Sequence, residues 1–447
     1  MDSKPLKVVV IGGDAAGMSA ASQVKRRVKT AHVVVLEKSE DVSYGACGMP
    51  YNISRKGDIN ELTVMSATQF KEKRGLDVRL LNEGIGVDTK ERIVNVKNVS
   101  TGRTYDINYD KLVIATGARA VKMPIEGVNQ DGVFSLKFLD DARRIKRYID
   151  EKNPQKAVLI GGGYINLELT ETYKTLGMDV VLLKKSDKMS GMYEDEVEEA
   201  IKLELKQNGV ELYTGVDIEK IEDDKTVVTN KGAFKTDLVS ISKGIIPNTE
   251  FLEGTDIELS KGAIVIDRYA ATTNPNVYAG GDCALIYNKL LKRNVFMPLG
   301  TNANKIGKLA GANIAGANEK FAGIVGTSVL KLFNITVAKT GLSLKEAQDE
   351  GYDAFKTVVT TKTRAHGFPN PKDISVIFIT EKNSGRLLGS QIFGGEGVAL
   401  RIDVMATALF ADMTIKDIQG LDLAYSPPFA PVWDPILVCA NQAIKRV

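Results

Sequence analysis

The sequence predicts an α/β protein with two Rossmann-like units, because a strand, a glycine-rich turn, a helix and a second strand follow one another twice. The first turn spans residues 12–17 and the second spans residues 161–166. Each turn follows a run of apolar, mostly β-branched residues, as expected for a strand buried on both faces of a parallel sheet. A chain of 447 residues has room for about three domains, so we expect a third unit after the two.

The first unit has the pattern of a dinucleotide site. A strand over residues 7–11 leads into Gly12-Gly13-Asp14-Ala15-Ala16-Gly17, and the next strand ends at Glu37. Glycines let the backbone approach a pyrophosphate, the helix N-terminus stabilises its charge, and the acid can bind a ribose hydroxyl. Asp14 replaces the central glycine, so its carboxylate must point away from the phosphates or meet a cation. The expected binding residues are Gly12, Ala15, Ala16, Gly17, Glu37, Lys38 and Ser43.

The second unit repeats this pattern with two changes. Asn166 occupies the place of the third glycine, which normally allows close packing of the helix on the strand, so we expect looser packing with phosphate binding retained. The second strand ends in Lys184 and Lys185 instead of an acid. Two ammonium groups favour the 2′-phosphate of NADPH, unless both lysines are simply solvated. The expected binding residues are Gly161, Gly163, Tyr164, Ile165, Glu168, Lys184, Lys185 and Gly244.

Two such units in one chain imply two dinucleotides. One usually binds and leaves as a hydride carrier, here NADH or NADPH, while the other stays bound as a flavin. A flavin such as FAD can pass electrons onward singly or to a thiol.

The composition argues against several other classes of protein. The net charge of +3 and the lack of a concentrated basic cluster disfavour nucleic-acid binding. No apolar stretch approaches the ~20 residues of a membrane span, and the N-terminus lacks the pattern of a signal peptide. Three widely spaced cysteines cannot form a disulfide framework and fit a reducing, cytoplasmic location. With two histidines in the chain, a histidine-based metal site or catalytic triad is not expected.

At this point the chain resembles the pyridine nucleotide-disulfide oxidoreductases, which use FAD and NAD(P)H. Residues 110–117 resemble the strand and turn that lead from the FAD domain to the NAD domain, and residues 273–282 resemble the second FAD signature. The resemblance implies that Asp282 binds the ribityl chain of FAD. It also implies that residues 298–304 open a helix whose positive N-terminus faces the flavin pyrimidine ring. These segments add Ala115, Thr116, Gly117, Asp282, Thr301 and Ala303 to the expected FAD-binding residues.

Cys47 resembles the single cysteine of the coenzyme A disulfide reductase and NADH oxidase branch of this family. A free cysteine is most often a small buried hydrophobe. Here the glycines around it and the following Pro50-Tyr51 favour a redox-active thiol, whose thiolate we expect oxidised flavin and a nearby helix end to stabilise. We interpret Cys283 and Cys439 as structural.

Two further segments bear on the substrate. Residues 22–26 resemble the stretch that meets the coenzyme A phosphates in coenzyme A disulfide reductases, which implies that Gln23 and Arg26 bind substrate. The alternative is that the basic run 25–27 is a solvated helix face. Residues 424–429 resemble a C-terminal motif whose tyrosine, here Tyr425, reaches the cysteine of the partner subunit and donates to a thiolate leaving group.

The resemblance therefore implies an FAD-dependent NAD(P)H oxidoreductase that reduces a disulfide, such as coenzyme A disulfide, through Cys47. Two departures keep other acceptors open. Ala15 and Ala16 stand where peroxidase and water-forming oxidase members usually carry a histidine, and His366-Gly367-Phe368 lacks the paired tyrosines of the disulfide reductases. The alternatives are a persulfide or polysulfide reductase, an NAD(P)H oxidase that reduces dioxygen, and a flavin redox sensor without catalytic turnover.

The same resemblance predicts the domain organisation. Residues 1–117 and 250–323 are expected to form the FAD domain, with residues 118–249 inserted as the NAD(P)H domain. Residues 324–447 are expected to form an α/β dimerisation domain that includes a strand at residues 375–379. We expect a cytoplasmic homodimer.

Overall fold

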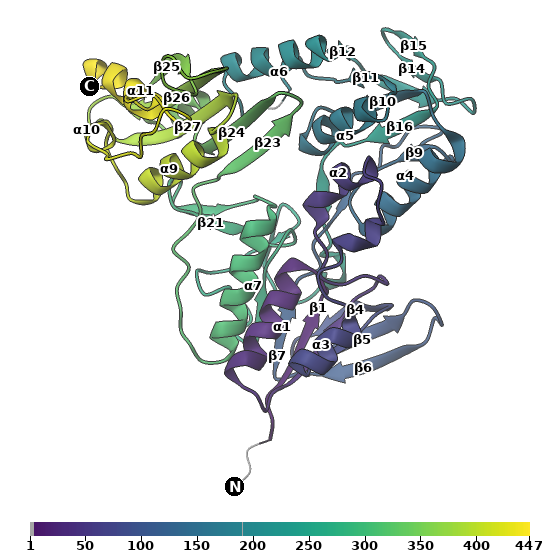
Figure 1. Ribbon diagram of the computed structural model, residues 1–447. Helices are drawn as coiled ribbons and strands as arrows, with labels where there is room; N and C mark the ends of the chain where they lie inside the picture. Colours follow the sequence, from purple (N-terminus) through teal and green to yellow (C-terminus); the bar gives the residue numbers. More distant parts are fainter. Residues whose placement is uncertain (1–3, 190) are drawn as a thin grey trace.

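The computed structural model describes residues 4–189 and 191–447, which fold around three five-stranded sheets (Figure 1). The first sheet is parallel and has the order β20-β7-β1-β2-β3. Its central valines, Val8, Val9 and Val10, are fully buried, as the continuous apolar run predicts. The strands are β1 (Lys7–Ile11), β2 (His32–Leu36), β3 (Asp77–Arg79), β7 (Lys111–Ile114) and β20 (Val277–Ala279). Since β20 lies far along the chain, the chain returns to this sheet after building the second one.

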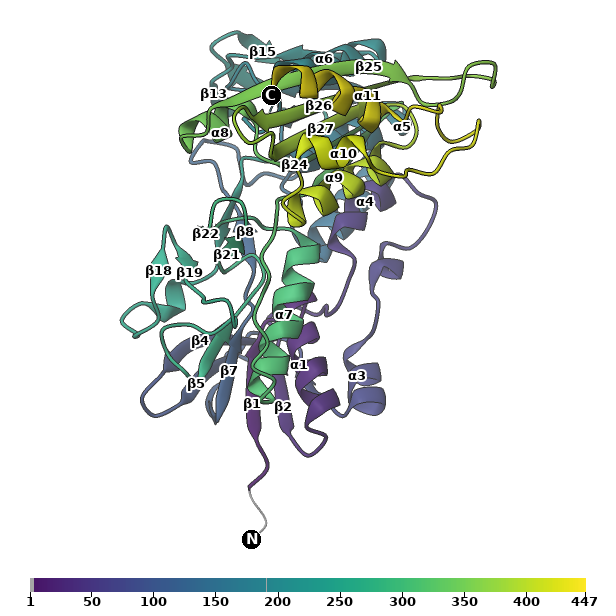
Figure 2. The ribbon, with the colours of Figure 1, turned by 90° about the vertical axis from the view of Figure 1, so that its left-hand side faces the viewer.

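Two helices, α1 (Ala15–Arg27) and α7 (Gly300–Ile314), lie side by side against the first sheet in both views (Figures 1 and 2). Their close approach depends on glycine, because a β-carbon at Gly307 or Gly311 would overlap the backbone oxygen of Ala16 or Ala20. The helix α7 thereby brings a distant part of the sequence beside the first glycine-rich turn. Around this sheet lie α3 (Ala67–Arg74) and the antiparallel strands β4 (Asn82–Asp88), β5 (Ile93–Asn98) and β6 (Thr104–Asn108). The segment between β2 and α3 forms η1 (Ala46–Gly48), α2 (Met49–Ile53) and η2 (Ile59–Leu62), and α2 and η2 pack against the second unit (Figure 1).

The second sheet is also parallel and has the order β12-β11-β10-β16-β9. Its strands are β9 (Val133–Phe134), β10 (Lys156–Ile160), β11 (Asp179–Leu183), β12 (Val210–Tyr213) and β16 (Leu238–Ile241). The helices of this unit are α4 (Leu139–Lys152), α5 (Tyr164–Thr175) and α6 (Asp195–Gln207). A small antiparallel sheet adds β13 (Ile218–Ile221), β14 (Val227–Thr229) and β15 (Gly232–Phe234). The chain passes from the first sheet to the second through β8 (Ala118–Ala120) and returns through β17 (Ile245–Pro247). These two strands pair antiparallel, so the two crossings run next to each other. The two parallel sheets confirm the predicted α/β fold.

The third sheet is antiparallel and has the order β23-β24-β27-β26-β25. The strand expected at residues 375–379 is part of β26, which is buried along almost its whole length. The elements of this unit are β23 (Ser328–Leu332), β24 (Ile335–Gly341), α8 (Leu344–Asp349), β25 (Ala354–Lys362), β26 (Asp373–Glu381), β27 (Leu387–Gly394), α9 (Val398–Phe410), α10 (Ile415–Gln419), α11 (Pro435–Ala443) and η4 (Ile444–Arg446). The remaining short elements belong to the first unit: η3 (Glu250–Leu252), β18 (Leu259–Ser260), β19 (Ala263–Ile264), β21 (Ile286–Asn288) and β22 (Arg293–Val295).

Three glutamates of the second unit accept hydrogen bonds from backbone N–H groups next to the third sheet. Glu171 on α5 accepts from Phe333, Glu194 before α6 accepts from Leu344, and Glu204 on α6 accepts from Asn334, each at 2.8 Å. Hydrogen bonds to charged acceptors are stronger than neutral ones. The second unit is therefore bonded to the third at two places, the turn between β23 and β24, which meets Glu171 and Glu204, and the start of α8, which meets Glu194.

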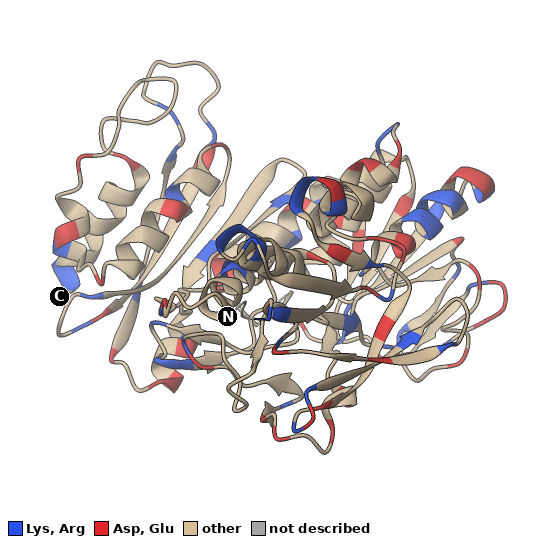
Figure 3. Ribbon diagram, turned by 90° about the horizontal axis from the view of Figure 1, so that it is seen from below, with Lys and Arg blue, Asp and Glu red and all other residues tan. Residues whose placement is uncertain are grey.

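The surface carries charges of both signs, which are interspersed along the ribbon when the molecule is seen from below (Figure 3). None of the helices in the described part of the chain is both long and apolar enough to cross a membrane. Large apolar side chains are exposed on α9 and before α11 of the third unit: Leu400 (76%), Phe429 (76%), Val432 (66%) and Trp433 (58%).

Candidate active site

The first glycine-rich turn is shaped to receive a phosphate. Gly12 has a φ of 108°, and a β-carbon there would overlap the carbonyl oxygen of Ala115. A β-carbon at Gly17 would overlap the carbonyl oxygen of Gly12. Asp14, the residue before α1, makes no side-chain hydrogen bond that caps the helix. Unpaired N–H groups at a helix start bind anions, so the turn fits a pyrophosphate.

Glu37 lies at the end of β2, as the sequence predicts. Its Oε2 accepts the backbone N–H of Gly13 at 2.8 Å, and its Oε1 accepts the backbone N–H and the hydroxyl of Ser39, also at 2.8 Å. The acid therefore borders the phosphate-binding turn. The exposed Lys38 places its ammonium 5.7 Å from the centre of the Phe138 ring.

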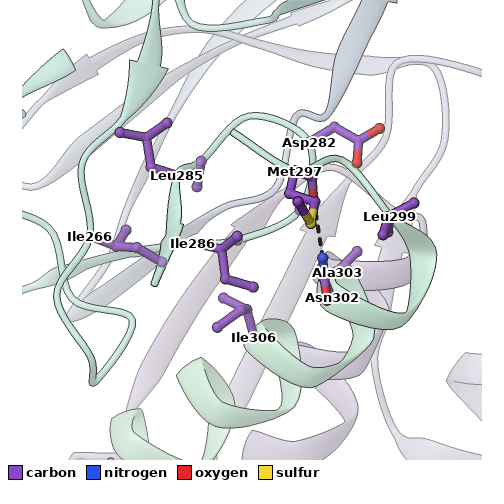
Figure 4. A pocket seen from close by; sticks show the side chains of 12 residues that line it. Ile266, Asp282, Leu285, Ile286, Met297, Leu299, Asn302, Ala303 and Ile306 are labelled. Carbon is purple, nitrogen blue, oxygen red and sulfur yellow. Dashed lines mark hydrogen bonds between the residues drawn. The ribbon is translucent and has the colours of Figure 1, made fainter. Parts of the chain in front are cut away.

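Asp282 lies beyond β20, at a small pocket that residues 280–282 form with the start of α7 (Figure 4). Its carboxylate forms an ion pair with Lys137 at 2.8 Å. Asn302 is buried and donates to the backbone oxygen of Met297 at 3.1 Å, which fixes the turn before α7. Ala303 lines the pocket, whereas Thr301 is exposed at the first turn of α7.

The residues after β7 join this site to the crossing strands. The Thr116 hydroxyl donates to the backbone oxygen of Asn248 at 2.6 Å, and Gly117 has a φ of 63°. Ala115 packs against Gly12, as described above. An open helix start at the first turn, an acid after β2, and an acid beside a second helix start together fit FAD.

Cys47 lies in η1, two residues before α2, and is exposed. The protein around it still removes part of the hydration of the sulfur, and this burial, together with the Glu168 carboxylate, raises the pKa of the thiol. Lys137 acts in the opposite direction. The chain's own groups therefore do not favour the thiolate as we expected from a nearby helix end. The physical reason is that desolvation and the carboxylates of Glu168, Asp282 and Asp14 outweigh the one ammonium group of Lys137.

The other two cysteines are fully buried. The Cys283 sulfur contacts the backbone oxygens of Ile114 and Gly280, and the Cys439 sulfur contacts those of Thr357 and Val376. Their structural role stays a prediction.

Glu168 on α5 reaches across to the Cys47 segment. It accepts the hydroxyl of Tyr51 at 2.9 Å, and burial raises its pKa to about 7. The pKa of Tyr51 is raised by burial and by this carboxylate. A proton-exchanging group that titrates near neutrality therefore lies beside the thiol.

The second glycine-rich turn is tighter than the sequence suggests. Gly161 has a φ of 102°, and a β-carbon there would overlap the carbonyl oxygen of Ser242. The buried Asn166 amide donates to the backbone oxygens of Ile160 and Gly161, at 2.9 and 2.8 Å. The expected loosening is thus wrong, because two side-chain hydrogen bonds tie α5 to the end of β10 where the usual glycine would only permit close contact.

Two lysines follow β11, but they differ in environment. The Lys184 carbon chain lies against Gly162, where a β-carbon would be 2.9 Å from its Cδ and Cε atoms, and burial lowers its pKa. Lys185 is exposed and forms an ion pair with Asp217 at 2.7 Å. The positive charge beside the second turn therefore comes mainly from Lys184.

The structure also places three further binding residues predicted for the second unit, Tyr164, Ile165 and Gly244. The Tyr164 hydroxyl lies 2.8 Å from that of Ser328 and accepts the hydroxyl of Tyr193 at 3.0 Å. Ile165, half-buried, packs on the core, and Gly244 has a φ of 102° beside Val121.

A larger pocket of about 300 Å³ runs along α1 toward Ser43, four residues before Cys47. Gln23 and Arg26, the two residues expected to bind substrate, line it, and the Arg26 guanidinium donates to Gln23 at 2.7 Å. The structure adds Arg74 from α3, whose guanidinium donates to Ser22 at 2.7 Å, and Lys308 from α7. Three cations from three helices thus line one pocket, and the pattern around Arg26 alone did not reveal the other two.

Tyr425 lies in the segment between α10 and α11, with half of its surface exposed. This segment lies beside residues 365–368, because the Ala365 N–H donates to the backbone oxygen of Pro427 at 3.1 Å. Residues 366–368, which lack the paired tyrosines of the disulfide reductases, thus lie next to the segment that carries Tyr425.

Two phosphate-binding turns and a free cysteine between them define an oxidoreductase that carries two nucleotides. The chain belongs to the pyridine nucleotide-disulphide oxidoreductase family, whose model matches residues 6–307, and the dimerisation domain of that family matches residues 327–435. The resemblance predicted from the sequence is confirmed, and so are an oxidoreductase activity and the use of FAD with NADH or NADPH.

The chain is similar to two proteins of known activity and to one solved structure. An NAD(P)H coenzyme A polysulfide/persulfide reductase of Pyrococcus horikoshii is 38% identical over 440 residues, which cover 97% of this chain and 98% of the relative. A coenzyme A disulfide reductase of Staphylococcus haemolyticus is 28% identical and covers 95% of this chain and 96% of its own. The solved structure of an NAD-dependent persulfide reductase from A. fulgidus has a TM-score of 0.94 and 36% identity, and the match covers 98% of this chain and 83% of that one.

Proposed function

We propose that this protein uses NADPH or NADH to reduce a sulfur–sulfur bond in a disulfide of coenzyme A, with Cys47 as the reacting thiol. The observation that carries this proposal is the pocket along α1, where Arg26, Arg74 and Lys308 converge. Clustered cations recognise phosphates, and a pocket that ends at Ser43 would bring a phosphate-bearing thiol to the Cys47 loop. FAD, when bound, would supply the two electrons that the thiol needs.

The proposed reaction balances with one protein thiol. The Cys47 thiolate attacks one sulfur of the disulfide, a protein–coenzyme A disulfide forms, and the other thiol leaves after taking up a proton. Two electrons that originate from NAD(P)H then break the new disulfide, which returns the Cys47 thiolate and a second coenzyme A thiol. Glu168 is placed to take the thiol proton, directly or through Tyr51, since its carboxyl titrates near neutrality.

A persulfide or polysulfide is the second candidate acceptor. It is favoured by the relative of Pyrococcus horikoshii, which is named for that activity, and by the absence of the tyrosine pair around residues 366–368. In this case coenzyme A would occupy the pocket as a carrier, and the sulfur bonded to it would be the one that Cys47 meets.

An acceptor panel tests the proposal. Oxidation of NADPH is followed without oxygen in the presence of coenzyme A disulfide, polysulfide or cystine, and then with dioxygen alone. We expect coenzyme A disulfide to be the best substrate, and Arg74→Ala or Lys308→Ala to raise its KM about tenfold or more, the equivalent of losing one charge-assisted bond. Arg27→Ala is the matched control, because Arg27 is on α1 but pairs with Glu319 outside the pocket. Equal rates with cystine and coenzyme A disulfide would refute the role of the pocket.

The cysteine is tested by Cys47→Ser. This variant is expected to keep its FAD and to lose disulfide and polysulfide reduction by several orders of magnitude, because a serine hydroxyl does not ionise near neutral pH. Remaining NADPH consumption should yield peroxide from dioxygen. A protein that consumes about one equivalent of NADPH and then stops with every acceptor would instead be a redox sensor.

We further propose the domain and subunit organisation. The FAD domain comprises residues 1–117 and 250–323, the NAD(P)H domain residues 118–249, and the dimerisation domain residues 324–447. The match of residues 327–435 to the family's dimerisation domain and the exposed apolar side chains near α9 and α11 support a homodimer. In this dimer Tyr425 approaches Cys47 of the partner subunit.

A further inference from the structure

Asp14 precedes α1, but its side chain bonds a different segment, the loop that carries Cys47. An aspartate in this position normally accepts a hydrogen bond from the first turn of its own helix. Here the Asp14 side chain does not cap α1, and its Oδ1 accepts the backbone N–H of Tyr44 at 3.3 Å, three residues before Cys47. The adjacent Ser43 N–H donates to the backbone oxygen of Gly13 at 3.0 Å. The phosphate-binding turn thus holds the start of the cysteine loop by two consecutive amides.

The loop needs such support because of its backbone conformation. Ser43 has a φ of 50°, a left-handed conformation that is unfavourable for residues other than glycine. On the opposite side the Val64 N–H donates to the Ser43 oxygen at 2.7 Å, and the Gly45 N–H donates to the Leu62 oxygen at 2.8 Å. Residues 43–45 are therefore held from two sides, and Asp14 provides a side-chain contact on the side of α1.

The same carboxylate also acts on the sulfur through its charge. Asp14, with Glu168 from α5 and Asp282 from the turn after β20, raises the pKa of Cys47, and Lys137 lowers it. Burial, with a smaller contribution from Glu37, raises the pKa of Asp14 itself to about 6, against the opposing effects of the Tyr44 and Ala15 N–H groups and of Lys137. Asp14 is therefore neutral well below pH 6 and negative above it.

We propose that Asp14 is a positioning residue for the redox-active cysteine, which holds the Cys47 loop against the phosphate-binding turn and places a negative charge beside the sulfur. The inference rests on the proposed function, since it takes Cys47 as the reacting group. The two effects oppose each other, because the anchor orders the loop while the charge disfavours the thiolate. Asp14→Asn separates them, since an amide oxygen still accepts the Tyr44 N–H but carries no charge. Asp14→Ala removes both.

The charge is tested by the rate at which iodoacetamide alkylates Cys47 in the NADPH-reduced holoenzyme, measured by mass spectrometry between pH 5 and 9. At pH 8 we expect Asp14→Asn to react on the order of threefold faster than the wild type, as for a change of about half a pKa unit. At pH 5 the two rates should agree, because Asp14 is then protonated. Asp88→Asn is the control, since its carboxylate also accepts backbone N–H groups, at 2.9 Å from Lys90 and Glu91, in an exposed turn. Superimposed profiles, or an equal shift in the control, would overturn the inference.

The anchor is tested by hydrogen exchange of the peptide covering residues 43–48 in the holoenzymes. We expect exchange about tenfold faster in Asp14→Ala and unchanged in Asp14→Asn, because only the alanine leaves the Tyr44 N–H without its acceptor. Equal exchange in the two variants would refute the anchoring role. Both measurements read the thiol and its loop directly. They remain valid if Cys47→Ser keeps full activity, a result that would refute the proposed function alone.

Discussion

Lys184 should decide which nicotinamide cofactor the protein prefers. Its side chain lies against Gly162 of the second phosphate-binding turn, whereas Lys185 is already paired with Asp217 in solvent. Replacing Lys184 by alanine removes the cation that is placed to meet a ribose 2′-phosphate. Replacing Lys185 removes a cation that must first give up its own partner. The two neighbours should therefore contribute unequally.

The expected magnitudes follow from these environments. A hydrogen bond to a charged group contributes about 1.5–3 kcal/mol, so Lys184→Ala should lower the ratio of kcat/KM for NADPH to that for NADH at least tenfold. An exposed ion pair contributes about 0.2–1 kcal/mol, so the pairing with Asp217 should reduce the contribution of Lys185 to the NADPH preference by up to about fivefold. Asp217→Asn, which frees Lys185, should accordingly raise the preference for NADPH by up to about fivefold.

The assay is steady-state oxidation of NADPH and of NADH with the same saturating acceptor. The prediction is that wild type prefers NADPH, that Lys184→Ala loses most of this preference, and that the effect comes from KM for NADPH. Lys243→Ala serves as a control, since this exposed lysine adjoins the same sheet end without lying at the strand end that meets the ribose. Equal or better use of NADH by the wild type, unchanged in Lys184→Ala, would show that both lysines are merely solvated.

Three further predictions concern cofactor, proton and assembly. The purified protein should be yellow with about one FAD per chain, and Gly12→Ala should lose most of the flavin absorbance, because the new β-carbon overlaps the Ala115 oxygen; a colourless wild type that takes up no added FAD would contradict the scheme. Glu168→Gln should raise the unfolding temperature relative to wild type at pH 8 but not at pH 4. A carboxyl whose pKa is raised to about 7 contributes stability at low pH, and this stability is lost as the pH rises through that value. Identical differences in unfolding temperature at both pH values would show that the charge of Glu168 plays no part. Trp433→Glu should convert a homodimer into monomers, as measured by light scattering, and should slow disulfide reduction, because Trp433 is 58% exposed in the single chain. A wild-type monomer with full activity would exclude a contribution of Tyr425 from a partner subunit.

Local sequence patterns were sufficient to predict the parts of the fold that depend on backbone geometry. The glycines at 12, 17 and 161 each stand where a β-carbon would overlap a backbone atom, so glycine at those positions is a direct signal of the turn. Buried parallel strands need continuous apolar runs, which located β1, β2, β10 and β11 within one or two residues.

Features that depend on contacts between distant segments could not be read in this way. The ion pair of Lys137 with Asp282 joins residues 145 apart, and nothing in the segment around Lys137 signals it. The pocket cations Arg74 and Lys308 come from separate helices that only the folded chain brings beside Arg26. The prediction of loose packing at Asn166 was wrong because the side-chain amide donates hydrogen bonds to the backbone at the end of β10. A comparison of the sizes of asparagine and glycine does not reveal these bonds.

The three carboxylates that fasten the second unit to the third also limit how nucleotides can be exchanged. A hinge rotation of the second unit would have to break the bonds of Glu171, Glu194 and Glu204 at once, and each would leave a charged acceptor without its donor. These bonds should therefore restrain rotation of the second unit against the third while the nicotinamide carrier binds and leaves. Heating should then unfold the second and third units in one cooperative step.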